Sequence, residues 1–239
     1  MRALPLISLL LVVCTVAGQT AADLDSEPHY HLLLENSSVR MFRMTLHPDE
    51  SALVRFRHSF MTVALQDGEI IVWDEGKSPI QHFQVHKGET SFRCVSSICV
   101  TPEQLAKGLS GGYRNDRQKD YGNITVEFLD PNIGWDATQG AGLTGDPGST
   151  FLGGAILDDA QLKPGESLPA PEKPGAELVV ALSDIDLKGS EGVRIRKSIG
   201  EVAWIPPEGA SALVNHGRAT AWFVVVEFHP DTPFAPLNR

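Results

Sequence analysis

The residues with the chemistry to bind a small molecule cluster in the stretch VRFRHSF, where Arg55, Arg57 and His58 stand close together. Guanidinium groups bind carboxylates through paired hydrogen bonds, so this stretch predicts a site for a small anionic ligand. Alternate residues of an exposed strand can equally form a solvated face, and that alternative stays open. The candidate ligand-binding residues share polar or ionisable side chains on or beside predicted strands: Arg55, Arg57, His58, Tyr113, Arg114 and Glu127.

Other titratable residues form weaker patterns. His29 and His31 have the spacing of metal ligands on one strand face, but no third donor can be placed beside them, which favours a role at the surface or between subunits. Glu127 and Glu227 hold equivalent places in apolar strands, where they either point inward as acids or face solvent. No Ser-His-Asp order, phosphate-binding loop or paired-carboxylate spacing rises above chance, so the sequence leaves open whether the protein is an enzyme.

Composition limits the class of partner. The 239 residues are 42% hydrophobic and 21% charged, enough for the core of one large or two small domains. The formal net charge is −10, with acids and bases interspersed along the chain. Because no basic patch exists, we expect neither nucleic acid nor an anionic membrane surface as a partner.

The N-terminus has the order of a targeting segment. Its residues MRALPLISLLLVVCTVAGQTAAD combine Arg2, an apolar run over 3–13 and small residues near 16–18. This order is typical of a cleaved signal peptide, and the apolar run is too short to span a bilayer. We predict a signal peptide over 1–18 and a secreted or periplasmic protein with no stable membrane insertion after cleavage. A retained anchor and lipid attachment at Cys14 are the alternatives.

Two cysteines, Cys94 and Cys99, would remain after cleavage, in an oxidising compartment. We predict a disulfide between them that closes a small loop and stabilises the protein by about 2–3 kcal/mol on the chain-entropy account. A redox motif would need a two-residue spacing, and a zinc site would need two further ligands nearby.

Short alternating or apolar runs separated by Gly and Pro turns predict an all-β barrel or sandwich. Residues 101–108 form the one predicted helix, with Thr101 as N-cap, Pro102 in the first turn and Gly108 at the end. The segment 131–148 holds five glycines, which indicates a linker.

An internal repeat explains the order of the strands. The turn PDES at 48–51 recurs as PGES at 164–167, and the triplets VAL and VEF also occur twice, about a hundred residues apart. Two copies of one unit account for this better than one large domain. The predicted domains are a first barrel over 28–130, a Gly-rich linker over 131–150 and a second barrel over 151–231.

These residues resemble the cupin superfamily, and specifically a two-cupin (bicupin) protein. The resemblance rests on the turn PGES, the strand ending VAL and the run GEVAWIPP, and it covers about 39–130 and 151–231. It implies tandem β-barrels or jelly rolls, with one short helix inserted in the first copy. It also implies metal ligands from two motifs, G-x5-H-x-H-x3,4-E-x6-G and G-x5-P-x-G-x2-H-x3-N.

The histidines of both motifs are missing. In the first copy the first motif places Arg55 and Arg57 at the histidine positions, and in the second copy only its glutamate, Glu177, survives. The histidine of the second motif is replaced by Gly111 in the first copy and by Ser211 in the second. Arginine cannot donate a lone pair to a metal ion, so we expect neither a metal nor another cofactor in these barrels.

The sequence therefore predicts a secreted bicupin without a metal centre that binds a small anionic or sugar ligand or has a structural role. The alternative is a cupin-type enzyme, an isomerase, dioxygenase or lyase acting on a sugar or small organic acid in the first barrel. His58 and Tyr113 would then act as base and acid, or His58 and Glu127 as unconventional metal donors. A homodimer is also open, because cupin barrels often pair through strand edges.

Overall fold

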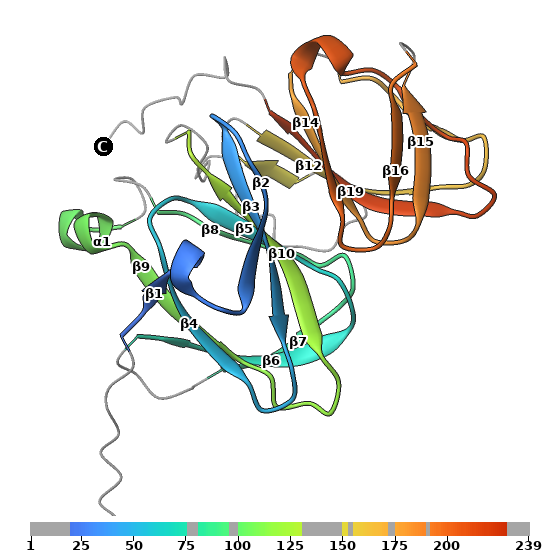
Figure 1. Cartoon of the computed structure of the whole chain (residues 1–239). Helices are drawn as coiled ribbons and strands as arrows, with labels where there is room; N and C mark the ends of the chain where they lie inside the picture. The colour runs from blue at the N-terminus through green and yellow to red at the C-terminus, as the bar shows by residue number, and fades with distance from the viewer. Residues whose placement is uncertain are drawn as a thin grey trace, which may run out of the picture.

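The computed structural model describes residues 20–75, 81–95, 100–130, 150–152, 155–171, 175–189 and 192–228. Strands dominate it and form four sheets, two from the first half of the chain and two from the second (Figure 1). The described α-helix, α1 (Pro102–Lys107), lies in the first half and begins with a capping box between Thr101 and Gln104. The predicted all-β fold with one short helix in the first copy is confirmed.

Two five-stranded sheets form the first barrel. One has the spatial order β1 (Ala22–Asp23), β4 (Ser51–Phe56), β9 (Leu109–Arg114), β6 (Gly68–Asp74) and β7 (Gln81–Val85). The other has the order β2 (Tyr30–Glu35), β3 (Val39–Leu46), β10 (Tyr121–Phe128), β5 (Phe60–Ala64) and β8 (Thr90–Arg93). Between β1 and β2 lies the 3-10 helix η1 (Leu24–Ser26).

The strand β9 directly follows the helix α1, and it was not predicted from the sequence. Its glycines lower strand propensity, yet it pairs with β4 on one side and β6 on the other. Gly112 is required there, because a Cβ atom would lie 2.0 Å from the ring of Trp73. The space taken by that ring explains why the strand carries so weak a sequence signal.

The second barrel also has two sheets. The first contains, in spatial order, β11 (Thr150–Leu152), β12 (Ala155–Leu162), β19 (Ala221–Phe228), β14 (Glu177–Ala181) and β17 (Val202–Ile205). The second contains β13 (Ser167–Leu168), β18 (Leu213–Asn215), β15 (Ile185–Gly189) and β16 (Arg194–Lys197). A 3-10 helix, η2 (Pro207–Gly209), follows β17.

The two barrels repeat each other down to single hydrogen bonds. The side-chain amide of Asn115 donates to the carbonyls of Leu46 and Lys119, at 2.9 and 2.8 Å. The amide of Asn215 donates in the same way to Leu162 and Ala219, both at 2.8 Å. Each asparagine is buried, so these bonds replace the water its amide would otherwise bind.

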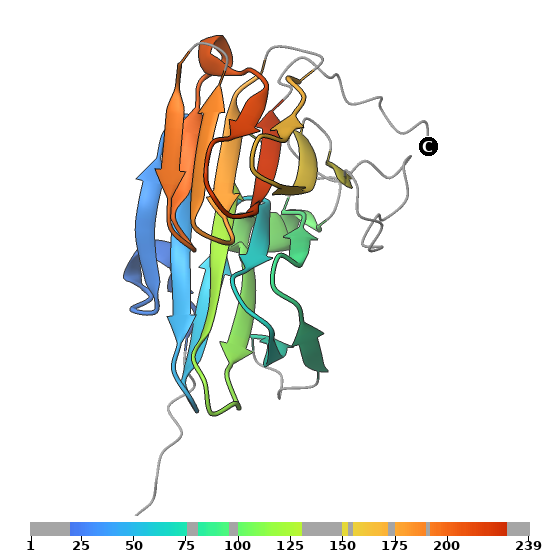
Figure 2. The same ribbon diagram turned by 90° about the vertical axis from the view of Figure 1, so that its right-hand side faces the viewer.

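Three apolar cores hold the molecule together. One fills each barrel, and the third lies between them, where the outer faces of β3, β5 and β10 pack against those of β12, β14 and β19. Every residue of β10 is buried, and so is every residue of β19 except Trp222, because both strands contact a core on each face. Figure 2 shows the barrels stacked along the length of the molecule.

Several predictions fall outside the described residues. These are the signal peptide over 1–18, the linker predicted over 131–150 apart from Thr150, and the partner cysteine Cys99, so the domain limits and the disulfide with Cys94 stay predictions. In the part of the chain that the structure describes, no helix is both long enough and apolar enough to cross a membrane.

Candidate functional site

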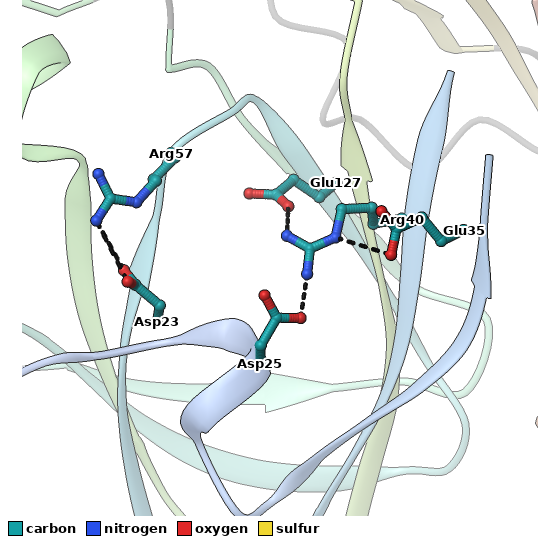
Figure 3. A network of polar contacts seen from close by, with 6 residues as sticks. All are labelled: Asp23, Asp25, Glu35, Arg40, Arg57 and Glu127. Atoms are coloured by element: carbon teal, nitrogen blue, oxygen red, sulfur yellow. Dashed lines mark hydrogen bonds and ion pairs between the residues drawn. The ribbon is translucent and has the colours of Figure 1, made fainter. Parts of the chain in front are cut away.

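One end of the first barrel, which we call the mouth, is built around a buried ion pair between neighbouring strands. Arg40 on β3 and Glu127 on β10 are register partners, and both side chains point inward because the residues next to them pack between the barrels. The Nη1 atom of Arg40 donates to Glu127 Oε2 at 3.2 Å (Figure 3). Asp25 also contacts this guanidinium, and Glu35 lies 3.7 Å from its Nε atom.

Glu127 is the buried anion of the mouth, with a side chain only 2% exposed. Burial raises its pKa, while the charges of His58 and Arg40 and the backbone N–H groups of Arg57 and His58 oppose that shift. The carboxylate is thus surrounded by donors of its own chain, which makes it an anchor for the mouth.

The segment 21–27, which we call the N-terminal plug, covers the mouth. β1 pairs in parallel with the edge of β4, and Leu24 is only 3% exposed in the first-barrel core. Asp23 lies 3.2 Å from Arg57 and 3.8 Å from Arg55. The backbone N–H of Ala21 donates to Glu75 Oε1 at 3.0 Å. The arginines predicted to bind an anionic ligand therefore bind an aspartate of the protein itself.

The structure brings four of the six candidate residues to the mouth: Arg55, Arg57, His58 and Glu127. Tyr113 lies among the residues of the first-barrel core, where burial raises its pKa to about 12, and its charged neighbour is Arg93. Arg114 lies at the opposite end of β9 and pairs with Asp116 at 2.5 Å. Among the described residues, no hydrogen bond or ion pair joins Tyr113 to His58 or Glu127.

Sequence reasoning missed Arg40, Asp23 and Asp25. Arg40 alternates with apolar residues in VRMFRMTL, a pattern that also suits an exposed face. Only the sheet register reveals that its partner is Glu127. The two aspartates follow the predicted signal peptide in a stretch that has no strand pattern, so no local signal could have assigned them to the mouth.

The second barrel holds a pair of acids at the equivalent end. Glu177 on β14 and Glu227 on β19 are register partners and are both buried. Burial and the neighbouring charge of Glu227 raise the pKa of Glu177 to about 7. Ser211, which stands at a motif histidine position, is buried as well.

The structure also places the residues of the metal motifs and the paired histidines. In the described residues, no group of three or more His, Cys, Asp or Glu side chains converges in a way that could hold a metal ion. His29 Nδ1 lies 2.6 Å from Glu27 and its Nε2 atom 3.5 Å from Glu50, while His31 is exposed. The two histidines of this pair therefore have separate surroundings.

An open pocket of about 460 Å³ lies at the far end of the first barrel, opposite the mouth. Its lining includes the largely buried Tyr121, against whose ring Gly68 packs so closely that a Cβ there would lie 3.2 Å from it. The walls come from the β6–β7 hairpin and the β9–β10 loop. The lining residues used below are Asp67, Glu69, Gln84, Gln118, Lys119 and Asp120.

No protein-family profile matches this sequence, and no curated protein matches it. Solved structures are similar in fold at low sequence identity. The bacterial pirin YhhW from Escherichia coli, solved in complex with nickel(II), is 10% identical with a TM-score of 0.57, over 84% of this chain and 91% of that one. Procruciferin, an 11S globulin from Brassica napus, is 8% identical with a TM-score of 0.54, over 88% of this chain and 87% of that one.

A cupin 2 conserved barrel domain protein from Leptotrichia buccalis is 13% identical with a TM-score of 0.50, over 83% of this chain and 88% of that one. Each likeness spans both barrels and not one alone, and the repeated Asn115 and Asn215 bonds show that the barrels are copies of one unit. The chain therefore has the two-barrel cupin fold.

Proposed function

We propose that this protein is an exported bicupin that binds a small sugar-like ligand without a metal, in the pocket at the far end of the first barrel. The observation that carries the proposal is the open pocket of about 460 Å³, a size within the range of small-molecule sites. The mouth, by contrast, is covered by the N-terminal plug, and its arginines are paired with Asp23 and Asp25.

The lining of the pocket suits a ligand with many hydroxyl groups. Asp67, Glu69 and Asp120 supply carboxylate acceptors, while Gln118 and Lys119 supply donors. His82 and Arg117 lower the pKa of Glu69, so that this carboxylate stays ionised and can accept hydrogen bonds from hydroxyls. The three carboxylates outnumber the two full cations of the lining, Arg117 and Lys119, which disfavours an anionic ligand.

The enzyme alternative needs His58 and Tyr113 beside one open cavity, or His58 and Glu127 around a metal. Glu127 instead accepts backbone N–H groups and pairs with Arg40. Among the described residues, neither His58 nor Glu127 is a hydrogen-bond or ion-pair partner of Tyr113. Nothing in the described residues favours the enzyme over a binding protein. Export remains supported by the signal-peptide pattern of residues 1–18.

Self-association through β2 is a further part of the proposal. β2 forms one edge of its sheet, and on it Leu32 and Leu33 are 50% and 40% exposed. An exposed apolar edge strand favours pairing with another chain. A second copy of this chain is the proposed occupant, since a dimer by two-fold symmetry would cover both leucines of each copy. Light scattering of purified protein and of a Leu32→Lys variant would test it.

The binding proposal can be tested by calorimetric titration of the mature protein with D-glucose, D-galactose and D-mannose, and with citrate as an anion. We expect one of the sugars to bind and citrate not to bind. Gly68→Val should weaken binding about tenfold or more by narrowing the pocket, and Gln118→Ala should weaken it less by removing one hydrogen-bonding group. Gln81→Val, on the same hairpin but outside the pocket, is the control and should bind like the wild type.

Two results would overturn the proposal. One is the absence of millimolar binding for all three sugars. The other is about one equivalent of iron, manganese, zinc or nickel in the purified protein, which would restore a metal-dependent cupin.

A further inference from the structure

The pocket at the far end of the first barrel has a histidine beside each of its three carboxylates. The pairs, with the distance from Nδ1 to the carboxylate oxygen, are His47 with Asp120 at 2.9 Å, His82 with Glu69 at 3.1 Å and His86 with Asp67 at 3.8 Å. One histidine follows β3, one lies on β7 and one follows β7. The fold therefore gathers these pairs at the pocket from separate parts of the chain.

Two cations complete the charged lining of the pocket. Arg117 contacts Oε2 of Glu69, an atom to which Gln84 Nε2 donates at 3.0 Å. His82 contacts the other oxygen of the same carboxylate, Oε1. Lys119 also lines the pocket and is exposed, and among the described residues its ammonium has no carboxylate as an ion-pair partner. Glu69 thus lies between two groups that can both be positive, and Lys119 is open to a ligand.

The other charged groups that face these histidines lie outside the lining. They are Glu50 beside His47, and Lys87 and Glu89 beside His86. The ammonium of Lys87 lies 5.1 Å from the ring centroid of Trp222 and is not part of the lining. Carboxyl and ammonium groups ordinarily keep their charge between about pH 5 and 8, whereas imidazole gains or loses its charge there. The histidines are therefore the groups of this set that respond to mild acid.

The net charge of the lining and its histidines changes sign when the imidazoles gain protons. With neutral histidines, the three carboxylates and the two cations give a net charge of −1, and with three protonated histidines the net charge is +2. The hydrogen bond and the charge of Asp120 raise the pKa of His47. The hydrogen bond of His82 lowers the pKa of Glu69, so this carboxylate stays ionised beside the imidazole. In mild acid the histidines thus neutralise the carboxylates, and the pocket attracts an anion.

We propose that this pocket binds sugar acids under mildly acidic conditions, and that protonation of His47, His82 and His86 switches its selectivity from neutral sugars alone to their acids as well. This switch rests on the proposed function, because the ligand class and its regulation concern the same pocket. At neutral pH the carboxylate of a sugar acid meets a lining of net negative charge. At about pH 5 its hydroxyl groups have the same hydrogen-bond acceptors, and its carboxylate binds Arg117 and Lys119.

The test is calorimetric titration of the mature protein at about pH 5 and about pH 8, at low ionic strength to limit screening of exposed charges. The probes are D-galacturonate and D-glucuronate, each with the neutral sugar of the same ring, D-galactose and D-glucose. With water-like screening, one added charge about 7 Å from the ligand strengthens binding about two- to threefold. We therefore expect a uronate to bind about tenfold more tightly at pH 5 than at pH 8, and its neutral sugar to change by less than about threefold.

The triple variant His47→Gln, His82→Gln and His86→Gln keeps hydrogen-bonding side chains that do not take up a proton. It should bind the uronate at pH 5 as weakly as the wild type does at pH 8, and its affinity for the neutral sugar should stay within about threefold. His31→Gln combined with His216→Gln is the control, because both histidines are exposed and lie outside the lining. The control should keep the pH dependence of the wild type. Circular dichroism at both pH values checks that each variant is folded.

The possible results separate the switch from the sugar site itself. If a neutral sugar binds but the uronate binds no more tightly at pH 5 than at pH 8, or if the triple variant keeps the pH dependence, the switch is overturned and the sugar site stands. If no neutral sugar binds at pH 8 while a uronate binds at pH 5, the neutral ligand is wrong and the switch is supported. If neither kind of ligand binds at either pH, both proposals are overturned.

Discussion

At the residue scale, Glu127 and Glu177 show two outcomes of burying a carboxylate in equivalent barrels. Glu127 has Arg40 as its register partner and accepts backbone N–H groups, so its charge is compensated. Glu177 has another acid as register partner, and one of its oxygens has no hydrogen bond from the described residues. The first arrangement compensates the charge of the buried carboxylate, and in the second, burial and the neighbouring acid raise the pKa of Glu177 to about 7.

Replacing Arg40 by methionine should destabilise the protein. The change leaves Glu127 buried without its cation, which should lower the free energy of unfolding by about 3 kcal/mol at pH 7, measured by urea denaturation. The loss should shrink as the pH falls, because Glu127 becomes protonated and no longer needs a counter-charge. The double variant Arg40→Met with Glu127→Gln should recover part of the loss. Equal stability of the single variant and wild type would contradict the role of this pair.

The pKa of Glu177 predicts how stability depends on pH. This pKa is raised to about 7 in the folded protein, above its usual range near 4.5, so the folded state holds a proton that the unfolded state releases. Stability contributed by this group is present below about pH 4.5 and is lost as the pH rises towards 7. Glu177→Gln should therefore raise the free energy of unfolding at pH 8 by about 1–3 kcal/mol and flatten its pH dependence between 4.5 and 7. An unchanged pH profile would show that Glu177 titrates normally.

At the scale of elements, the N-terminal plug decides what the first barrel can bind. Its backbone extends the edge of β4, Leu24 enters the core, and Asp23 and Asp25 meet the arginines of the mouth. Because the plug covers the mouth, we place the proposed ligand in the open pocket at the other end of the barrel.

Leu24→Ala should loosen the plug. We expect a loss of about 2–3 kcal/mol in the free energy of unfolding and faster proteolysis before Pro28, because the plug would lose its main apolar contact. Leu105→Ala is a matched control, since Leu105 lies on α1 and is 39% exposed. It should change stability by less than about 0.5 kcal/mol. Similar losses in both variants would mean that the plug does not depend on Leu24.

The plug also constrains where a signal peptide can be cleaved. Cleavage after Ala22 would remove the Ala21 bond to Glu75 and the pairing of Ala22 with Val54. We therefore expect N-terminal sequencing of the exported protein to begin before Ala21, consistent with cleavage after Gly18. A mature chain that begins at Asp23 would show that β1 is dispensable.

At the scale of the whole molecule, one apolar core lies between the barrels, and we therefore expect them to unfold as one unit. Phe128 and Phe228, equivalent residues of the two copies, have ring centroids 6.1 Å apart in that core. Their contact joins β10 to β19.

Urea unfolding should accordingly show one transition by Trp fluorescence and by circular dichroism. Phe128→Ala should lower the free energy of unfolding by about 3–5 kcal/mol and shift both signals together, because the interface supports both barrels. Two separated transitions in the wild type would mean that the barrels unfold independently.

The sequence by itself determined the strand-rich fold, the repeat and the helix near 101–108, because turn residues and apolar alternation are local signals. The VEF and VAL triplets located β10, β19, β5 and β14, and Thr101 marked the start of α1. It also grouped six residues into one site, of which the structure brings four to the mouth and places Tyr113 and Arg114 elsewhere.

Only the tertiary structure decided what those residues meet. Sheet register placed Arg40 against Glu127 and Glu177 against Glu227. The path of the N-terminal plug brought Asp23 and Asp25 to the arginines of the mouth. These are contacts between residues far apart in the chain, and their energy comes from burial and charge, which no local pattern encodes. For the same reason the strand β9 could not be predicted from the sequence. Its Gly112 is required by the ring of Trp73, which is a contact between residues far apart in the chain.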